Sequence, residues 1–277
     1  MRCRAAEGRA LGHASHRRST QTVWRLVRRR EVWWPTAFGW LAGLGCLAAL
    51  LVLAALGLDD FLTVREPARG ADGLGARTLV VEGWLEAHEL DQALAALKDG
   101  RHARVLTSGG PVESWNGESR WSSYAERAAS YLRPRLPPGI ELQAVPAPAV
   151  TRDRTYASAR AIAAWLDRRG LGAEPVDLYT ASIHARRSRM VYRLAFGPSV
   201  EVGVLAAAPR GWDAQRWWTS SRGAKAVIGE FLSLAWTACC FWPDAGDAAP
   251  PQAVAPQRPG AAPASGVASL QPPPSTR

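Results

Sequence analysis

The chain has 277 residues and a formal net charge of +10. Residues 1–30 hold nine arginines and one glutamate, so +8 of this charge lies there and the remainder is nearly balanced. A nucleic-acid groove would need basic side chains spread over the folded part, so we expect no nucleic-acid partner. None of the four cysteines has Cys-x-x-Cys spacing, so we expect neither a metal site nor a disulfide framework.

The N-terminal region predicts a membrane anchor. Residues 1–35 are basic and lack a core pattern, and residues 36–58 contain no charged side chain. Those 23 positions suffice to cross a hydrocarbon core of about 30 Å. Arginines stay on the cytoplasmic side of a membrane, so we expect a single-pass protein of the inner (plasma) membrane with a cytoplasmic N-terminus and an extracytoplasmic domain. A cleaved signal peptide is the alternative, although its apolar region is normally only about 7–15 residues.

The remaining chain predicts one α/β domain. Residues 59–75 contain Pro67, Gly70 and Gly73, which are typical of a linker, and residues 76–242 alternate between apolar runs and helical patterns. We expect strands at 79–81, 103–106, 140–145, 176–179 and 200–205, and helices around 90–97, at 124–132, at 155–169, from 182 and at 223–241. This alternation predicts a doubly wound, mostly parallel sheet of about five strands with helices on both faces. Residues 243–277 are rich in Pro and Ala and predict a disordered tail.

The first strand predicts where the functional groups lie. Leu79, Val80 and Val81 form an apolar run without alternation, which is typical of a strand buried on both faces of a parallel sheet. Glu82 and Trp84 follow directly, and ligands of such sheets bind beyond the carboxyl ends of the strands.

The second strand ends in Ser108, Gly109 and Gly110. Two glycines after a strand allow a sharp turn and a close approach of the backbone to a ligand, although a plain tight turn is the more common explanation of such a pair. The pattern is not a Gly-x-Gly-x-x-Gly fingerprint, so it does not indicate a dinucleotide, and the cofactor is unknown.

Arg152, Arg154 and Thr155 stand at the predicted start of a helix. Free amides and the helix dipole favour an anion there, and arginines bind phosphate or carboxylate well. Simple capping by Asp153 or Thr155, with solvated arginines, is the alternative.

His184, Arg187 and Ser188 have i, i+3, i+4 spacing and so share one face of the helix that Ser182 is expected to cap. The helix dipole disfavours a charged imidazole at this end, and a neutral His184 is suited to act as a general base. A structural histidine is the alternative.

Three tryptophans and one glutamate follow the fifth strand. Trp212, Trp217 and Trp218 suit either a lid or packing against the sheet edge or a nearby membrane, and we favour packing. Glu230 is expected to be a salt-bridge partner.

The order of these motifs resembles the YdcF-like family, a domain-of-unknown-function family that includes SanA and ElyC. The resemblance rests on four stretches within residues 77–205: Val80-Val81-Glu82-Gly83-Trp84, Thr107-Ser108-Gly109-Gly110, Arg154-Thr155-Tyr156-Ala157-Ser158-Ala159 and Ser182-Ile183-His184-Ala185-Arg186-Arg187. It implies a Rossmann-like domain, often behind one membrane anchor, with a role in envelope biogenesis. Ala157 and Ser158 stand where many members have Glu-Asn, and Ser158 keeps a hydroxyl.

Two functional hypotheses follow for this sheet edge. The first is an enzyme acting on a phosphate-bearing envelope precursor, in which His184 transfers a proton and Glu82 orients it or activates water. The second is a binding or regulatory module that holds an anionic ligand without reaction. A purely scaffolding role, in which the anchor and the Pro-rich tail tether partners, is the remaining alternative. Under both, the predicted ligand-binding residues are Gly83, Trp84, Ser108, Gly109, Gly110, Arg152, Arg154, Thr155, Ser158 and Arg187. The expected partners are a lipid bilayer and a small anionic ligand.

Overall fold

A computed structural model describes residues 34–70, 73, 75–113 and 119–243. The chain divides into two compact units, Met1–Ala49 and Leu50–Arg277, and each is described by itself. The expected basic segment (residues 1–33 of it) and nearly all of the expected tail, residues 244–277, lie outside the described residues.

Helix α1 (Ala37–Leu62) confirms the predicted apolar helix. Its 26 residues extend about 39 Å at 1.5 Å per residue. Among the described residues it is the one helix long and apolar enough to cross a membrane. The helix continues four residues past the predicted end, because Asp59 and Asp60 do not interrupt helical geometry.

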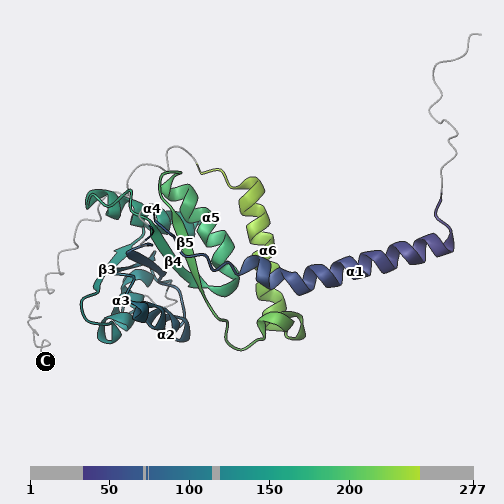
Figure 1. Cartoon of the computed structure of the whole chain (residues 1–277), viewed down its shortest axis with the longest axis horizontal. Helices are drawn as coiled ribbons and strands as arrows, with labels where there is room; N and C mark the ends of the chain where they lie inside the picture. Colours follow the sequence, from purple (N-terminus) through teal and green to yellow (C-terminus); the bar gives the residue numbers. More distant parts are fainter. Residues whose placement is uncertain (1–33, 71–72, 74, 114–118, 244–277) are drawn as a thin grey trace, which may run out of the picture. The chain divides into compact units, whose positions relative to one another are not determined.

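The second unit contains a five-stranded, all-parallel sheet (Figure 1). Its strands are β1 (Thr78–Glu82), β2 (Arg104–Gly109), β3 (Glu141–Pro146), β4 (Val176–Ala181) and β5 (Val202–Ala207). Their spatial order is β3-β2-β1-β4-β5, which confirms the Rossmann-like prediction. Every residue of β1 is buried, as expected for the central strand. The chain reverses its direction of travel across the sheet between β1 and β4, and this is the switch point at which ligands of such folds bind.

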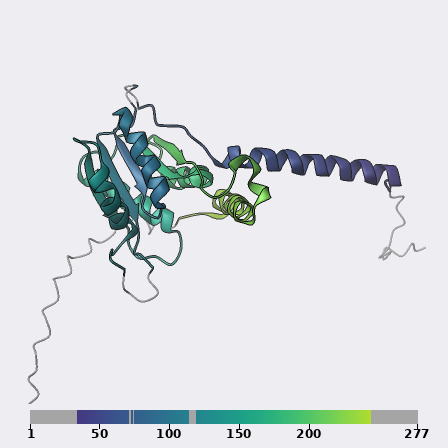
Figure 2. The same cartoon turned by 90° about the horizontal axis from the view of Figure 1, so that it is seen from below.

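Helices cover both faces of the sheet, as Figures 1 and 2 show. They are α2 (Ala87–Ala96), α3 (Tyr124–Leu132), α4 (Arg154–Arg168), α5 (Ala185–Phe196) and α6 (Ser221–Cys240), with short 3-10 helices η1 (Leu97–Asp99), η2 (Arg133–Arg135), η3 (Ser182–His184) and η4 (Ala214–Thr219). One core cluster joins α4 and α5 to the sheet through Ile162 and Tyr192. The other joins α2 and α3 to the opposite face through Leu90 and Leu132.

The segment that we expected to be a linker packs on the sheet. Glu66 forms an antiparallel bridge with Val204 of β5, and the amide of Ala68 donates to Asp177 at 2.7 Å. A Cβ at Gly203 would lie 2.0 Å from the nitrogen of Ala68, so glycine permits this approach. The packed region therefore begins before residue 76. Pro67 and the neighbouring glycines indicated only the irregular backbone, not its docking.

Two further expectations concern the region around α5 and η4. Ser182 does not cap α5, because the chain first forms η3 and the N-cap position falls on His184. Trp217 is buried, and its Nε1 donates to the carbonyl of Ala55 in α1 at 3.0 Å. Packing is therefore the correct interpretation of Trp217.

Candidate functional site

A cavity of about 440 Å³ opens at the carboxyl ends of β1, β2 and β3, and the start of α4 and the η3–α5 segment that follows β4 also line it. It lies at the switch point of the sheet, where the sequence predicted the site. Ten of the twelve predicted residues line it: Glu82, Trp84, Ser108, Gly109, Gly110, Arg154, Thr155, Ser158, His184 and Arg187. The prediction that separated motifs meet at one edge is thus correct, while the role of each residue stays a prediction.

Gly83 and Arg152 are the two predicted residues that do not line the cavity. A Cβ at Gly83 would lie 2.4 Å from the carbonyl oxygen of Tyr124 and 2.5 Å from that of Ser108. Gly83 therefore serves the close packing of the turn after β1. The side chain of Arg152 is exposed and lies 4.0 Å from Asp153, because the helix begins two residues later and leaves Arg152 in the preceding bend.

Glu82 is a buried acid at the end of the central strand. Thr180 of β4 donates to one of its oxygens at 2.5 Å, and Ser188 of α5 donates to the other at 3.2 Å. Burial raises the pKa of Glu82, against the opposing influence of these hydroxyls and of the neighbouring His184 and Arg187. Burial thus makes this carboxyl group a weaker acid than a solvent-exposed one, which suits a group that exchanges protons.

His184 is oriented by Glu230 of α6. Its Nδ1 lies 2.6 Å from a carboxylate oxygen of Glu230. Burial raises the pKa of Glu230, but hydrogen bonds and charges of His184 and Arg187 outweigh it, and the net pKa is lowered. Because Glu230 is then an acceptor, Nδ1 carries the proton of this contact. The structure therefore gives Glu230 the orienting role that we expected of Glu82, and Nε2 is the nitrogen left for a ligand.

Arg187 joins the same group. Its Nε and terminal nitrogen donate to the two oxygens of Glu230 at 2.5 and 3.1 Å, a bidentate pair. Trp84 packs edge-on against His184, with ring centroids 5.1 Å apart. These contacts fix the imidazole from two sides, and α5 and α6 are tied together beside the cavity.

The opposite wall is built by the start of α4. Arg154 donates to Glu113 at 2.7 Å, and the two side chains are 65% and 78% exposed. Asp153, the N-cap residue, has φ 58° and is the one described non-glycine residue with positive φ. The conformation costs free energy in a non-glycine residue, and the Asp153 side chain makes no capping hydrogen bond. Capping by the side chain of Asp153 is therefore not observed.

The floor of the cavity comes from β2. Ser108 shares a hydrogen bond of 3.0 Å with the hydroxyl of Tyr192. Gly109 has φ 146°, and a Cβ there would lie 2.7 Å from Cβ of Tyr124. Gly110 is not crowded, since its nearest neighbour to a Cβ would be 3.5 Å away. Gly109 thus lets α3 approach β2, whereas the carbonyl of Gly110 accepts a hydrogen bond from the amide of Tyr124 at 2.9 Å.

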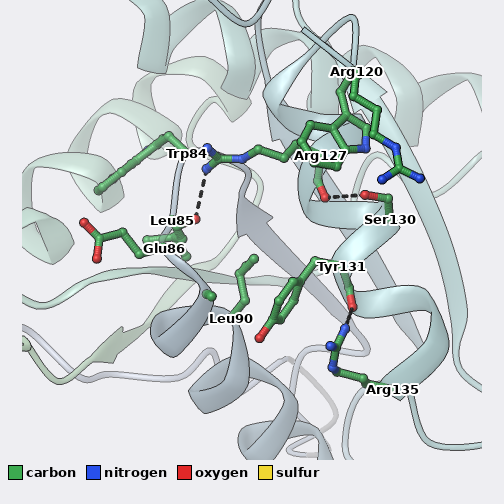
Figure 3. Close-up of a pocket in the computed structure, with 11 residues that line it drawn as sticks. Trp84, Leu85, Glu86, Leu90, Arg120, Arg127, Ser130, Tyr131 and Arg135 are labelled. Atoms are coloured by element: carbon green, nitrogen blue, oxygen red, sulfur yellow. Dashed lines mark hydrogen bonds between the residues drawn. The ribbon is translucent and has the colours of Figure 1, made fainter.

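A second cavity, of about 570 Å³, lies between α2 and α3 and shares Trp84 with the first. Figure 3 shows Arg127 reaching across it, where it donates to the carbonyls of Gly83 and Leu85 at 3.0 Å. Arg127 thereby holds the turn that carries Trp84. Among the described residues that line it, none is a buried carboxyl group or a histidine like those of the first cavity, so we place the candidate site in the first.

Sequence reasoning missed three residues that complete the site: Thr180, Ser188 as a partner of Glu82, and Glu230 as a partner of His184. Thr180 ends the strand beside β1, a position that could have indicated it. Glu230 lies 43 positions from Arg187, and no local pattern pairs them. Among the described residues no group of three His, Cys, Asp or Glu side chains could hold a metal ion.

Comparison with known proteins adds no relative to this description. No protein-family model matches the chain, and neither a curated protein nor a solved structure matches it.

Proposed function

We propose that this chain is a membrane-anchored, YdcF-like protein of the cell envelope whose cavity binds an anionic, phosphate-bearing ligand. The main support for this proposal is that Arg154, Arg187 and the start of α4 line the same cavity as a buried acid and a histidine. The arginine-rich N-terminus supports a cytoplasmic start and an extracytoplasmic domain. The ordered motifs quoted above support the family.

The anion would bind between Arg154 and the first turn of α4. The ion pair of Arg154 with Glu113 is exposed on both sides, and such pairs contribute only about 0–1 kcal/mol. A phosphate group can therefore replace Glu113 at low cost. The amides of the first helical turn lack partners within the helix and favour negative charge. Arg187 stays on Glu230, which balances its charge, so Arg154 is the cation that exchanges its partner for the anion.

Two titratable groups line the same cavity and support a reaction. A protonated Glu82 can give a proton to a leaving oxygen, and Nε2 of His184 can accept one from water or from a substrate hydroxyl. Burial raises the pKa of Glu82, whereas His184 keeps Nε2 free of the contact with Glu230, so one group is suited to donate a proton and the other to accept one. Hydrolysis or transfer of a phosphate ester is the reaction that this arrangement fits best.

Ligand binding without reaction is the second candidate. It is favoured by the finding that, among the described residues, no group of three His, Cys, Asp or Glu side chains could hold a metal ion. Under this proposal, Glu82 and His184 would recognise a protonated or hydrogen-bonding group of the ligand.

The binding test uses the full chain in detergent and inorganic phosphate as the probe. We expect phosphate, compared with chloride at equal ionic strength, to raise the Tm of the wild type. Arg154→Gln should lose most of this shift, because it removes the exchangeable cation. Arg152→Gln makes the same charge change two residues away, outside the cavity, and should keep the shift. Equal shifts in the two variants would reject the proposed anion position.

The catalytic test measures release of phosphate from p-nitrophenyl phosphate and from a phospholipid by the wild type, His184→Ala and Glu82→Gln. Turnover in the wild type that both substitutions remove would establish the reaction. A phosphate-dependent Tm shift without turnover of any ester would favour the binding module instead.

A further inference from the structure

From residue 226 onward, helix α6 has an exposed face without charge. Residues 226–243 contain one charged side chain, Glu230, and Glu230 is buried against the domain. Large apolar side chains on the outer side are exposed instead: Leu232 at 61% and Trp236 at 52%, together with Ile228 and Phe231. A helix that is apolar on all sides is normally buried, so water is not the environment that this face fits.

The C-terminal end of α1 lies beside this helix. Ala55, Leu58 and Leu62 of α1 belong to the same apolar cluster as Val227 and Leu234 of α6. Figures 1 and 2 both show α6 running crosswise to this end of α1. Ala55 and Leu58 are also the last residues of the uncharged run that predicts the membrane span. The cluster therefore sits at the depth where a spanning α1 would leave the hydrocarbon core.

We propose that the outer face of α6, together with Trp218 of η4, lies on the lipid bilayer as an interfacial surface. A helix crosswise to a spanning helix runs in the plane of the membrane. α6 does not itself qualify as a span among the described residues, and interfacial helices bury their apolar face about 5–10 Å into the headgroup boundary. Trp218 and Trp236 are half-exposed, which is the placement that tryptophan favours at this boundary.

Positive charges border the surface and favour lipid over a second copy of the chain. Arg186 and Arg193 of α5 line a cavity together with Leu234 and Ala238 of α6. Arg186 donates to the carbonyl of Phe61 at the end of α1. Each basic side chain near an anionic bilayer contributes about 1 kcal/mol of attraction. Two identical cationic rims would repel each other in a dimer.

The proposal does not depend on the anion site, and its test reads depth in the membrane. The full chain, with Cys3, Cys46 and Cys240 changed to Ser, keeps the native Cys239, which is exposed on α6. Leu232→Cys, with Cys239 also changed to Ser, gives a second position on the same face about two turns earlier. Ala95→Cys in the same background is the control, since Ala95 is exposed on α2. Each thiol carries a nitroxide spin label in vesicles of phosphatidylcholine and phosphatidylglycerol.

Collisions with oxygen and with a water-soluble nickel chelate are then compared by power saturation. We expect labels at 232 and 239 to favour oxygen over nickel and to report similar depths, whereas the label at 95 favours nickel. Preference for nickel at both α6 positions would overturn the proposal. Protection from both reagents with spin–spin broadening would also overturn it, because the face would then be covered by a second copy.

Discussion

Replacing Glu230 by alanine or glutamine tests the contact that joins α6 to the cavity. Glu230 accepts two hydrogen bonds from Arg187 and one contact from His184, and its own side chain is 3% exposed. Removing one partner of a buried pair costs about 3–5 kcal/mol. Arg187 and His184 keep 21% and 29% exposure, so water compensates in part and we expect about 3 kcal/mol for Glu230→Ala, the lower limit of that range.

Glu230→Gln keeps an acceptor and should cost less, about 1.5 kcal/mol, as for one hydrogen bond to a charged group. For a domain of this size, 3 kcal/mol corresponds to a Tm lower by about 6–12 °C. Urea unfolding of the full chain in detergent measures both values. The control is Glu66→Gln, because Glu66 pairs with Arg189 of the same helix at the same 2.5 Å but is 65% exposed. It should cost at most about 1 kcal/mol.

A double-mutant cycle of Glu230→Gln with Arg187→Gln isolates the pair. We expect a coupling free energy of about 1–3 kcal/mol, the range for contacting residues. Additive effects, or a cost for Glu230→Gln no greater than that for Glu66→Gln, would refute the reasoning that this carboxylate holds the arginine.

Three further predictions concern single positions. Gly83→Ala places a Cβ 2.4 Å from a backbone oxygen and should lower the free energy of unfolding by about 3 kcal/mol or more. The Cβ of Gly229→Ala in α6 would meet nothing within 4 Å, so this substitution should raise the free energy of unfolding by about 0.5–1 kcal/mol. Urea unfolding compares the two variants. Burial raises the pKa of Glu82 above 4.5, so its contribution to stability is full below pH 4.5 and is lost as pH rises through the folded-state pKa. In a series from pH 4 to 8, the Tm of Glu82→Gln should therefore decline less than the Tm of the wild type. Equal declines in the two proteins would contradict the buried acid. Trp217→Phe removes the hydrogen bond to Ala55 and should cost about 1–3 kcal/mol, and an unchanged Tm would disprove that anchoring role.

The sequence alone determined the elements and much of the site. Apolar runs and helical periodicity are local, so they located all five strands and the sheet type. The prediction that Glu82, Ser108 and His184 meet followed from one rule: parallel strands end at a common edge, so residues that follow them converge. The apolar run before residue 59 determined α1 in the same local way.

Only the tertiary structure decided what those residues touch. Glu230 lies on the last helix, and whether it reaches His184 depends on the angle at which α6 packs, which no local pattern encodes. The docking of Glu66 beside Val204 likewise depends on a free sheet edge and on the missing side chain of Gly203. Contacts between distant segments arise from packing, whereas sequence periodicity reports only the backbone of each segment.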